Sequence, residues 1–122
     1  MDPQKLAVFE ELLRSRRTAL MAKSGQALGE LTGERDTSGD ATDIASEESD
    51  RDLALRMHEL DRRLIREIEA ALVRVRAGEY GECAACGDDI AERRLMARPT
   101  ATHCIDCMTE LEATRSPRRA FA

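Results

Sequence analysis

Four cysteines are the residues whose type and spacing are best suited to chemistry in this sequence. They form two CxxC pairs, Cys83–Cys86 ("CAAC") and Cys104–Cys107 ("CIDC"), with seventeen residues between the pairs. Two intervening residues let both thiolates of a pair reach one ion, and two pairs complete the tetrahedral shell that zinc prefers. Four thiolates leave no position open for water, so the site is expected to be structural. We therefore predict one structural Zn²⁺ per chain.

Redox pairs, disulfides and unpaired buried thiols are the alternative interpretations of these cysteines. A thioredoxin-like CxxC needs a βαβ context, which the pattern lacks. The first residues, "MDPQKLAVFEELLRSRR", lack the charged-then-apolar order of a secretory signal, so we expect a cytoplasmic protein with reduced thiols. His103 could compete as a ligand, but four sulfurs already suffice, and we interpret it as a surface imidazole.

Composition narrows the possible architectures and partners. Aromatic residues make up only 2% of the chain and charged residues 35%, which favours long solvated helices over a thick core. Residues 34–52 hold eight acids and two arginines, a charge of −6, so the rest of the chain carries +1 of the total −5. This acidity argues against general affinity for nucleic acids or anionic membranes. No apolar run approaches the roughly 20 residues that span a bilayer.

Two long helices are predicted upstream of the cysteines. Asp2 and Pro3 read as a helix start, followed by apolar residues at Leu6, Phe9, Leu13, Leu20, Ala27 and Leu31. The segment "GERDTSGDATD" reads as a turn. A second helix is expected over 44–77, about 50 Å long at 1.5 Å per residue, and Gly78 is expected to stop it. Its apolar stripe is Leu53, Met57, Leu60, Leu64, Ile68, Leu72 and Val75.

We predict a mostly all-α fold with a long antiparallel helical hairpin, a coiled coil, and a small four-cysteine zinc-finger module. Two amphipathic helices joined by a turn should fold back so that each buries the other's stripe. His58 is expected to be solvated. The module is expected to have a core around Tyr80, Ile90, Leu95 and Ile105, and a short C-terminal helix over 105–114. The expected division is 1–78 for the hairpin, with its tip near 34–46, then 79–115 for the zinc finger and 116–122 for a flexible tail.

The segment "YGECAACGDDIAERRLMARPTATHCIDC", residues 80–107, closely resembles the zinc finger of the DksA/TraR family of bacterial RNA polymerase regulators. The shared features are YGxCxxCG, RRLxARPTA and CIxC, and the resemblance extends over roughly residues 40–113. It implies a coiled coil that enters the secondary channel of RNA polymerase with a DxxDxA motif at its tip. "DATDIA" fits that motif and implies a functional tip of Asp40, Asp43 and Ala45. A helix N-cap at Asp43 and a turn residue at Asp40 are the simpler alternatives.

Response to the alarmone ppGpp, a feature of several family members, is expected to be weak or absent here. The positions that supply lysines in responsive members are Glu67 and Met108 in this chain. Glutamate repels a polyphosphate and methionine offers no charge. Arg98 is retained as a possible polymerase or ppGpp contact. The segment before the tip is also short, so we expect a smaller globular part than in longer members.

The resemblance implies a monomeric, non-enzymatic transcription regulator linked to the stringent response. It would bind RNA polymerase through the secondary channel and modulate promoter-complex stability, without recognising a DNA sequence. The alternative is a zinc-ribbon module that binds nucleic acid or another protein, for which Arg93, Arg94 and Arg98 give some support. The chain lacks the aromatic stacking platform that would favour single-stranded nucleic acid. A thiol oxidoreductase is the remaining rival.

Overall fold

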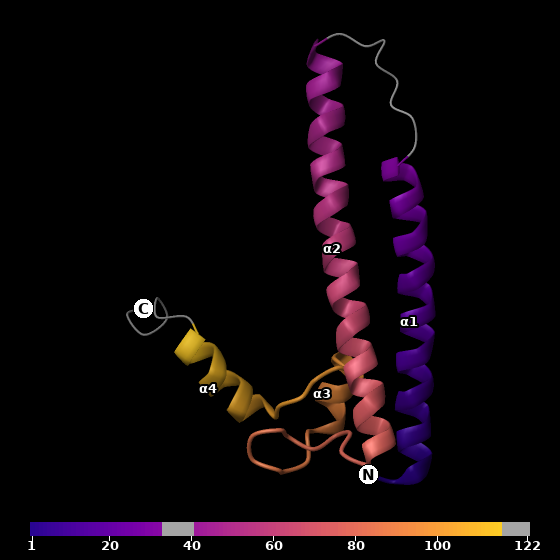
Figure 1. Cartoon of the computed structure of the whole chain (residues 1–122). Helices are drawn as coiled ribbons and strands as arrows, with labels where there is room; N and C mark the ends of the chain where they lie inside the picture. Colours follow the sequence, from indigo (N-terminus) through magenta and orange to yellow (C-terminus); the bar gives the residue numbers. More distant parts are fainter. Residues whose placement is uncertain (33–40, 116–122) are drawn as a thin grey trace. The chain divides into compact units, whose positions relative to one another are not determined.

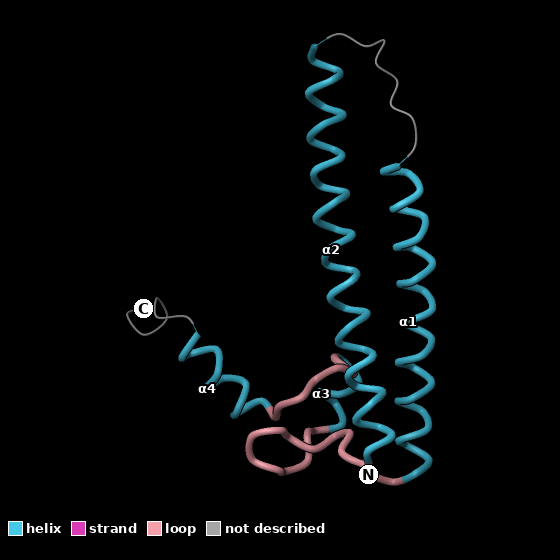
Figure 2. Tube along the Cα trace, viewed as in Figure 1, coloured by secondary structure: helices cyan, strands magenta, loops and turns pink. Residues whose placement is uncertain are grey.

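The computed structural model describes residues 1–32 and 41–115, and the side chains of these ranges except those of 26–32 and 41–43 (Figure 1). Its elements are four helices, α1 (Pro3–Thr32), α2 (Ala41–Ala77), α3 (Glu92–Ala97) and α4 (Ile105–Arg115). Within the described ranges the extended backbone is limited to an isolated antiparallel bridge between Glu82 and Asp89. The mostly all-α class is confirmed (Figure 2). The predicted tail, 116–122, lies outside the described residues.

The ends of the two long helices agree with the sequence signals. At the start of α1, Asp2 Oδ1 accepts a hydrogen bond from the backbone N–H of Gln4 at 3.0 Å, as an N-cap does. At the end of α2, Gly78 has a φ of 74°, the left-handed conformation that closes many helices. The Gly78 N–H donates to the Val75 carbonyl at 3.2 Å, and the Glu79 N–H donates to the Arg74 carbonyl at 2.9 Å. Both helix ends are therefore set by local chemistry.

Contacts divide the chain into two compact units. One comprises Met1–Arg14 and Ile68–Ala122, and the other comprises Ser15–Glu67. We call them the zinc-finger unit and the hairpin unit. Both long helices contribute to both units, and each unit is described by itself. The division of the chain at residue 78 stays a prediction.

The core of the zinc-finger unit is small and well buried. Phe9, Leu13 and Leu95 have exposed fractions below 2%, and the Phe9 and Tyr80 rings pack with centroids 5.8 Å apart. The Tyr80 hydroxyl donates to the Pro99 carbonyl at 2.8 Å, which satisfies its polar end inside the core. The prediction for Ile105 is wrong, because this side chain is 65% exposed. Ile105 is the first residue of α4, a helix without buried residues.

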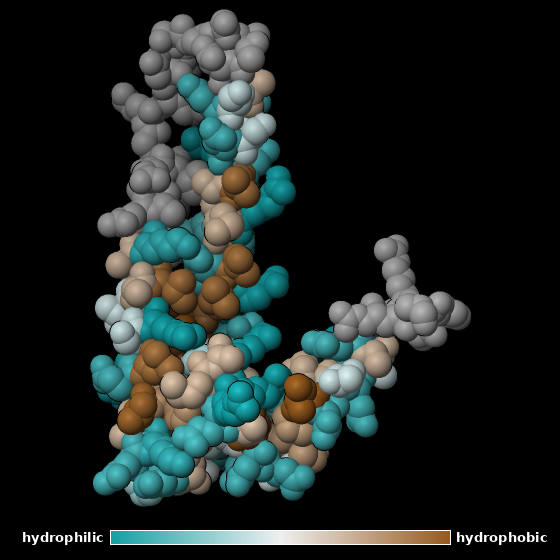
Figure 3. Space-filling view, turned by 180° about the vertical axis from the view of Figure 1, so that it is seen from behind, coloured by the Kyte–Doolittle hydropathy of each residue, from teal (hydrophilic) through white to brown (hydrophobic). Residues whose placement is uncertain are grey.

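In the hairpin unit α1 and α2 run antiparallel, but the predicted apolar stripe does not form their interface. Leu53, Met57 and Leu60 are 57%, 44% and 45% exposed. Figure 3 shows brown, hydrophobic side chains along the surface of the long helices. The expectation that each helix buries the other's stripe is therefore wrong for this part of α2.

Eight of the covered residues of α2 follow a strict heptad seam, and Leu64, Glu67, Ala71 and Arg74 are covered beside it. The spacing of the eight seam residues alternates between three and four, and all are buried or half-buried: Arg51, Ala54, His58, Asp61, Ile65, Ile68, Leu72 and Val75. Alternating steps of three and four keep one seam facing the partner helix. The predicted stripe instead takes three consecutive steps of four from Leu60 to Leu72, and it therefore winds away from the partner helix. Polar residues thus occupy seam positions, and the prediction of a solvated His58 is wrong.

Candidate metal centre

The first pair of cysteines sits on a tight knuckle between α2 and α3. The Gly87 N–H donates to the Cys83 carbonyl at 2.9 Å, and the Cys83 N–H donates to the Asp88 carbonyl at 2.8 Å. Gly87 has a φ of 77°, which a residue with a Cβ adopts only at a cost, so glycine is needed for this turn. The Ile90 N–H donates to the Gly81 carbonyl at 2.7 Å and closes the base of the loop. The backbone therefore fixes how Cys83 and Cys86 are presented.

The second pair is positioned by the start of α4. Cys104 directly precedes the helix, and its carbonyl accepts a hydrogen bond from the Met108 N–H at 2.9 Å. Cys107 lies in the first turn, so both thiols point to the same side. The Ala84 N–H donates to the Thr102 carbonyl at 2.8 Å and joins the two knuckles. A direct backbone bond thus holds the two pairs together.

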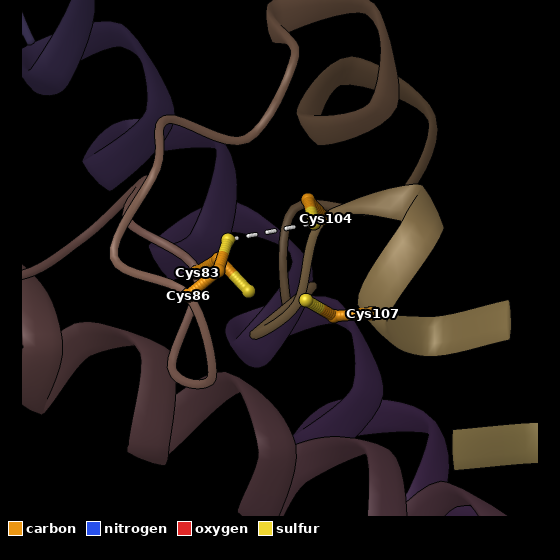
Figure 4. A group of neighbouring side chains, drawn as sticks. All are labelled: Cys83, Cys86, Cys104 and Cys107. Carbon is orange, nitrogen blue, oxygen red and sulfur yellow. Dashed lines mark hydrogen bonds between the residues drawn. The ribbon is translucent and has the colours of Figure 1, made fainter. Parts of the chain in front are cut away.

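The four sulfur atoms converge on one point, as Figure 4 shows. They lie within 4.8 Å of one another, and the Cys86 and Cys104 sulfurs are 3.8 Å apart. A tetrahedral ion with Zn–S bonds of about 2.3 Å requires neighbouring sulfurs to be about 3.8 Å apart. A disulfide would need about 2.05 Å, and all four cysteines are free. The site fits a structural Zn²⁺ held by Cys83, Cys86, Cys104 and Cys107.

Without a cation, the thiols of the cluster do not ionise alike. Backbone N–H donors, first that of Cys86 and then that of Cys104, lower the pKa of Cys83 to about 5. The pKa of Cys107 is raised by its side-chain hydrogen bonds, first with Cys104 and then with Cys83, and by burial. Several thiols close together resist simultaneous ionisation unless a cation is among them. A divalent ion supplies that charge and deprotonates its ligands outright.

Supporting hydrogen bonds around the knuckles come from α3, an element that the sequence reasoning missed. Arg94 Nε donates to the His103 carbonyl at 3.0 Å, beside Cys104. His103 Nδ1 lies 2.8 Å from Thr102 Oγ1, so its ring is engaged by a neighbour and is not part of the sulfur cluster. The acid Glu92 in the first turn of "ERRLMA" was the available helix signal.

The other predicted positions are spread over the two units. Asp40 lies outside the described residues, Asp43 lies in the first turn of α2 without a described side chain, and Ala45 is exposed on that helix. Glu67 belongs to the hairpin unit, whereas Arg98 and Met108 belong to the zinc-finger unit. Arg98 is exposed and lines a cavity of about 450 Å³ together with Arg94, Cys104 and Ile105.

Two family models match this chain. The model described as "DnaK suppressor protein DksA, N-terminal domain" matches residues 5–75. The model described as "Prokaryotic dksA/traR C4-type zinc finger" matches residues 78–113. The chain belongs to the DksA/TraR family. The C4-type finger and the convergent sulfurs together establish a structural zinc site, as predicted from the spacing.

Curated members of the DksA/TraR family resemble this chain over most of its length. The protein of Escherichia coli is 37% identical over 112 residues, which are 92% of this chain and 74% of that protein. The protein of Haemophilus influenzae is 32% identical over 92% of this chain and 77% of its own length. Both are named "RNA polymerase-binding transcription factor DksA".

Solved structures of DksA/TraR proteins have the same fold. Transcription factor DksA2 from Pseudomonas aeruginosa superimposes with a TM-score of 0.81 at 34% identity, covering 94% of this chain and 88% of that one. The DnaK suppressor protein from Agrobacterium tumefaciens gives a TM-score of 0.56 at 28% identity, covering 85% and 91%. None of the described helices in this DksA/TraR member is apolar enough over a sufficient length to cross a membrane.

Proposed function

We propose that this protein binds RNA polymerase directly and regulates transcription initiation without catalysing a reaction. The observation that carries the proposal is the 37% identity, over 92% of the chain, to a relative named as an RNA polymerase-binding transcription factor. Family models also match both the two long helices, over residues 5–75, and the zinc finger, over residues 78–113. The closed thiolate site offers no open coordination position for chemistry.

The proposed route of binding is the secondary channel, entered by the hairpin with its acidic end leading. Asp43 stands in the first turn of α2, where a helix N-terminus favours negative charge, and Ala45 is exposed beside it. A long helix that begins at this point would hold such a tip rigidly. We propose that Asp40, Asp43 and Ala45 act on the polymerase near its active site, and that the zinc finger supports binding outside the channel.

Regulation would arise from a shift between promoter-complex states. A factor changes such an equilibrium only through different affinities for the two states. An acidic tip that interacts differently with open and closed complexes supplies that difference without recognising a DNA sequence. The overall acidity of the chain, −5, favours a protein target over the DNA phosphates themselves.

The experiment is transcription in vitro from a ribosomal RNA promoter with purified polymerase, comparing the wild-type protein with Asp43→Asn. We expect Asp43→Asn to keep zinc, helicity and polymerase binding but to lose the effect on promoter-complex lifetime. Asp50→Asn is the matched control, because Asp50 is an exposed acid on the same helix outside the DxxDxA motif. Equal regulation by the wild type and Asp43→Asn would refute the tip mechanism, while polymerase binding would be judged separately.

The same assay tests the role of ppGpp. We expect little synergy, because Glu67 and Met108 offer no positive charge to a polyphosphate. Strong stimulation of the wild-type protein by ppGpp would contradict this. Titration with duplex and single-stranded DNA at moderate salt tests the alternative of a nucleic-acid-binding zinc ribbon, which predicts binding without polymerase.

A further inference from the structure

A cavity in the hairpin unit is not used by the proposed polymerase function. It has a volume of about 410 Å³ and lies between α1 and α2. Its lining combines basic and polar groups with an apolar wall: Met21, Ser24, Gly25, His58, Arg62, Ile65 and Arg66. None of these residues is Glu67, Arg98 or Met108, the positions that the family resemblance associates with ppGpp. The cavity is therefore a separate candidate site.

Two arginines give the cavity a local positive charge. His58, Arg62 and Arg66 are spaced by four residues along α2, which places them on one face of the helix. Neither arginine forms an ion pair with any described residue. The nearby cation Lys23 differs, because its Nζ lies 3.4 Å from Oδ2 of Asp61. The two guanidinium groups are thus available to an external anion.

His58 is the third polar side chain on this face of α2. Its Nδ1 lies 3.1 Å from Ser24 Oγ. When the Ser24 hydroxyl donates to Nδ1, the neutral imidazole carries its proton on Nε2. The histidine then holds a fixed orientation and has one N–H free for a ligand, in the way that second partners orient histidines elsewhere.

The remaining lining is apolar and open. Met21 is 47% exposed, Ile65 is half-buried, and a Cβ built on Gly25 would meet no atom within 4 Å. A ligand for this cavity should therefore carry an anionic group for the arginines and an apolar or planar body for this wall. The volume lies within the roughly 300–1,000 Å³ that is usual for small-molecule sites.

We propose that this cavity binds a small organic phosphate monoester. Guanidinium groups match the oxygens of phosphate in paired hydrogen bonds, and a phosphate near neutral pH carries almost two negative charges for the two arginines. A single carboxylate would leave one guanidinium uncompensated. A polyanion such as nucleic acid is disfavoured, because it would also meet the general acidity of the chain, whereas a small dianion meets only the local charge.

Calorimetric titration of the full-length, zinc-loaded protein with phenyl phosphate tests the proposal. We expect saturable binding of one phenyl phosphate per chain, about tenfold tighter than that of inorganic phosphate, because the ring contacts the apolar wall. The double variant Arg62→Gln with Arg66→Gln should weaken binding about tenfold or more. Gly25→Leu keeps every charge but places a side chain in the open space at the cavity lining, and it should also weaken binding.

The matched control uses two other arginines of α2. Arg56 and Arg63 border a different cavity of about 380 Å³, which also contains Glu59. The double variant Arg56→Gln with Arg63→Gln makes the same change in net charge on the same helix. We expect its affinity for phenyl phosphate to stay within about twofold of the wild type, because these arginines do not line the proposed site and exposed charges are screened by salt.

Three results would overturn the proposal. These are the absence of saturable binding of phenyl phosphate, an equal loss of affinity in the two arginine double variants, and tighter binding of a single-stranded oligonucleotide than of phenyl phosphate at the same salt. ADP serves as a further probe. Binding of ADP that is lost in Arg62→Gln with Arg66→Gln, and in Gly25→Leu, would support the proposal and extend the ligand class to nucleotides.

Discussion

Ser24 Oγ lies 3.1 Å from His58 Nδ1 across the interface between α1 and α2, in a seam that a regular coiled coil would fill with apolar residues. Next to this pair, Asp61 is only 3% exposed, and Lys23 Nζ lies 3.4 Å from its Oδ2. Polar groups at seam positions reduce stability but define which residues can face each other. A polar layer of this kind favours one alignment of the two helices within the hairpin unit.

The ion pair between Lys23 and Asp61 should behave as a coupled unit. Lys23→Met leaves the buried carboxylate without its partner and should lower the free energy of unfolding by about 1–3 kcal/mol. Adding Asp61→Leu should recover most of that loss, because an apolar side chain then fits the seam. Urea unfolding followed by circular dichroism gives both values. Additive losses in the double variant would contradict this interpretation.

Truncations along α2 should distinguish the observed seam from the exposed stripe. Leu72→Ala removes a buried side chain and should lower the free energy of unfolding by about 2–5 kcal/mol. Leu60→Ala removes a side chain that is 45% exposed and should cost less than about 1 kcal/mol. The two variants make the same chemical change in the same helix. Equal losses in denaturant unfolding would show that the stripe is buried in solution.

Tyr80 should ionise at unusually high pH. Burial raises the pKa of Tyr80 to about 12, compared with about 10 for an unfolded chain. The folded state therefore keeps the proton longer. Tyr80 should therefore contribute fully to the free energy of unfolding below about pH 10. This contribution should be lost as the pH rises through about 12.

Tyrosinate absorbance measures this ionisation directly, because Tyr80 is the single tyrosine and the chain has no tryptophan. The native protein should titrate about two pH units above the protein in urea. Tyr80→Phe provides the control for stability, since its free energy of unfolding should lack this alkaline decline. Coincident native and unfolded titrations would rule out a buried phenol.

Removal of zinc should disrupt the cysteine-bearing segment first. Structural zinc contributes on the order of 10 kcal/mol to such modules, and the core around Leu95 is small. A strong chelator should reduce the metal content below one ion per chain, and so should Cys107→Ser. In both cases the NMR amide signals of residues 79–115 should lose their dispersion. Unchanged signals in the metal-free protein would mean that the core alone holds the fold.

Features that depend on local chemistry could be predicted from the sequence. The CxxC spacing identified the four ligands, because two intervening residues restrict where the sulfurs can point. Asp2 and Gly78 marked helix ends, because a cap acts within one turn of its own helix. The resemblance of residues 80–107 to the DksA/TraR finger also indicated the family that the comparisons then established.

The buried face of α2 could not be predicted in the same way. Hydrophobicity alone placed Leu53, Met57 and Leu60 inside and His58 outside, and the structure reverses both assignments. The path of the partner helix decides which side of an amphipathic helix is covered. In α2 the covered side follows the three–four spacing of the heptad seam and not the apolar stripe. The exposure of Ile105 has a similar cause, because nothing in its own segment reveals which elements pack over α4.

The sequence by itself thus determined the metal, its ligands, the two long helices and the family, because each depends on residues close together in the chain or on a motif. Only the tertiary structure decided that Ser24 meets His58, that Asp61 is buried, and that Arg62 and Arg66 border a cavity with Met21. Those relationships join residues more than thirty positions apart. They exist only once the two helices have been aligned against each other, which is a property of packing and not of either helix alone.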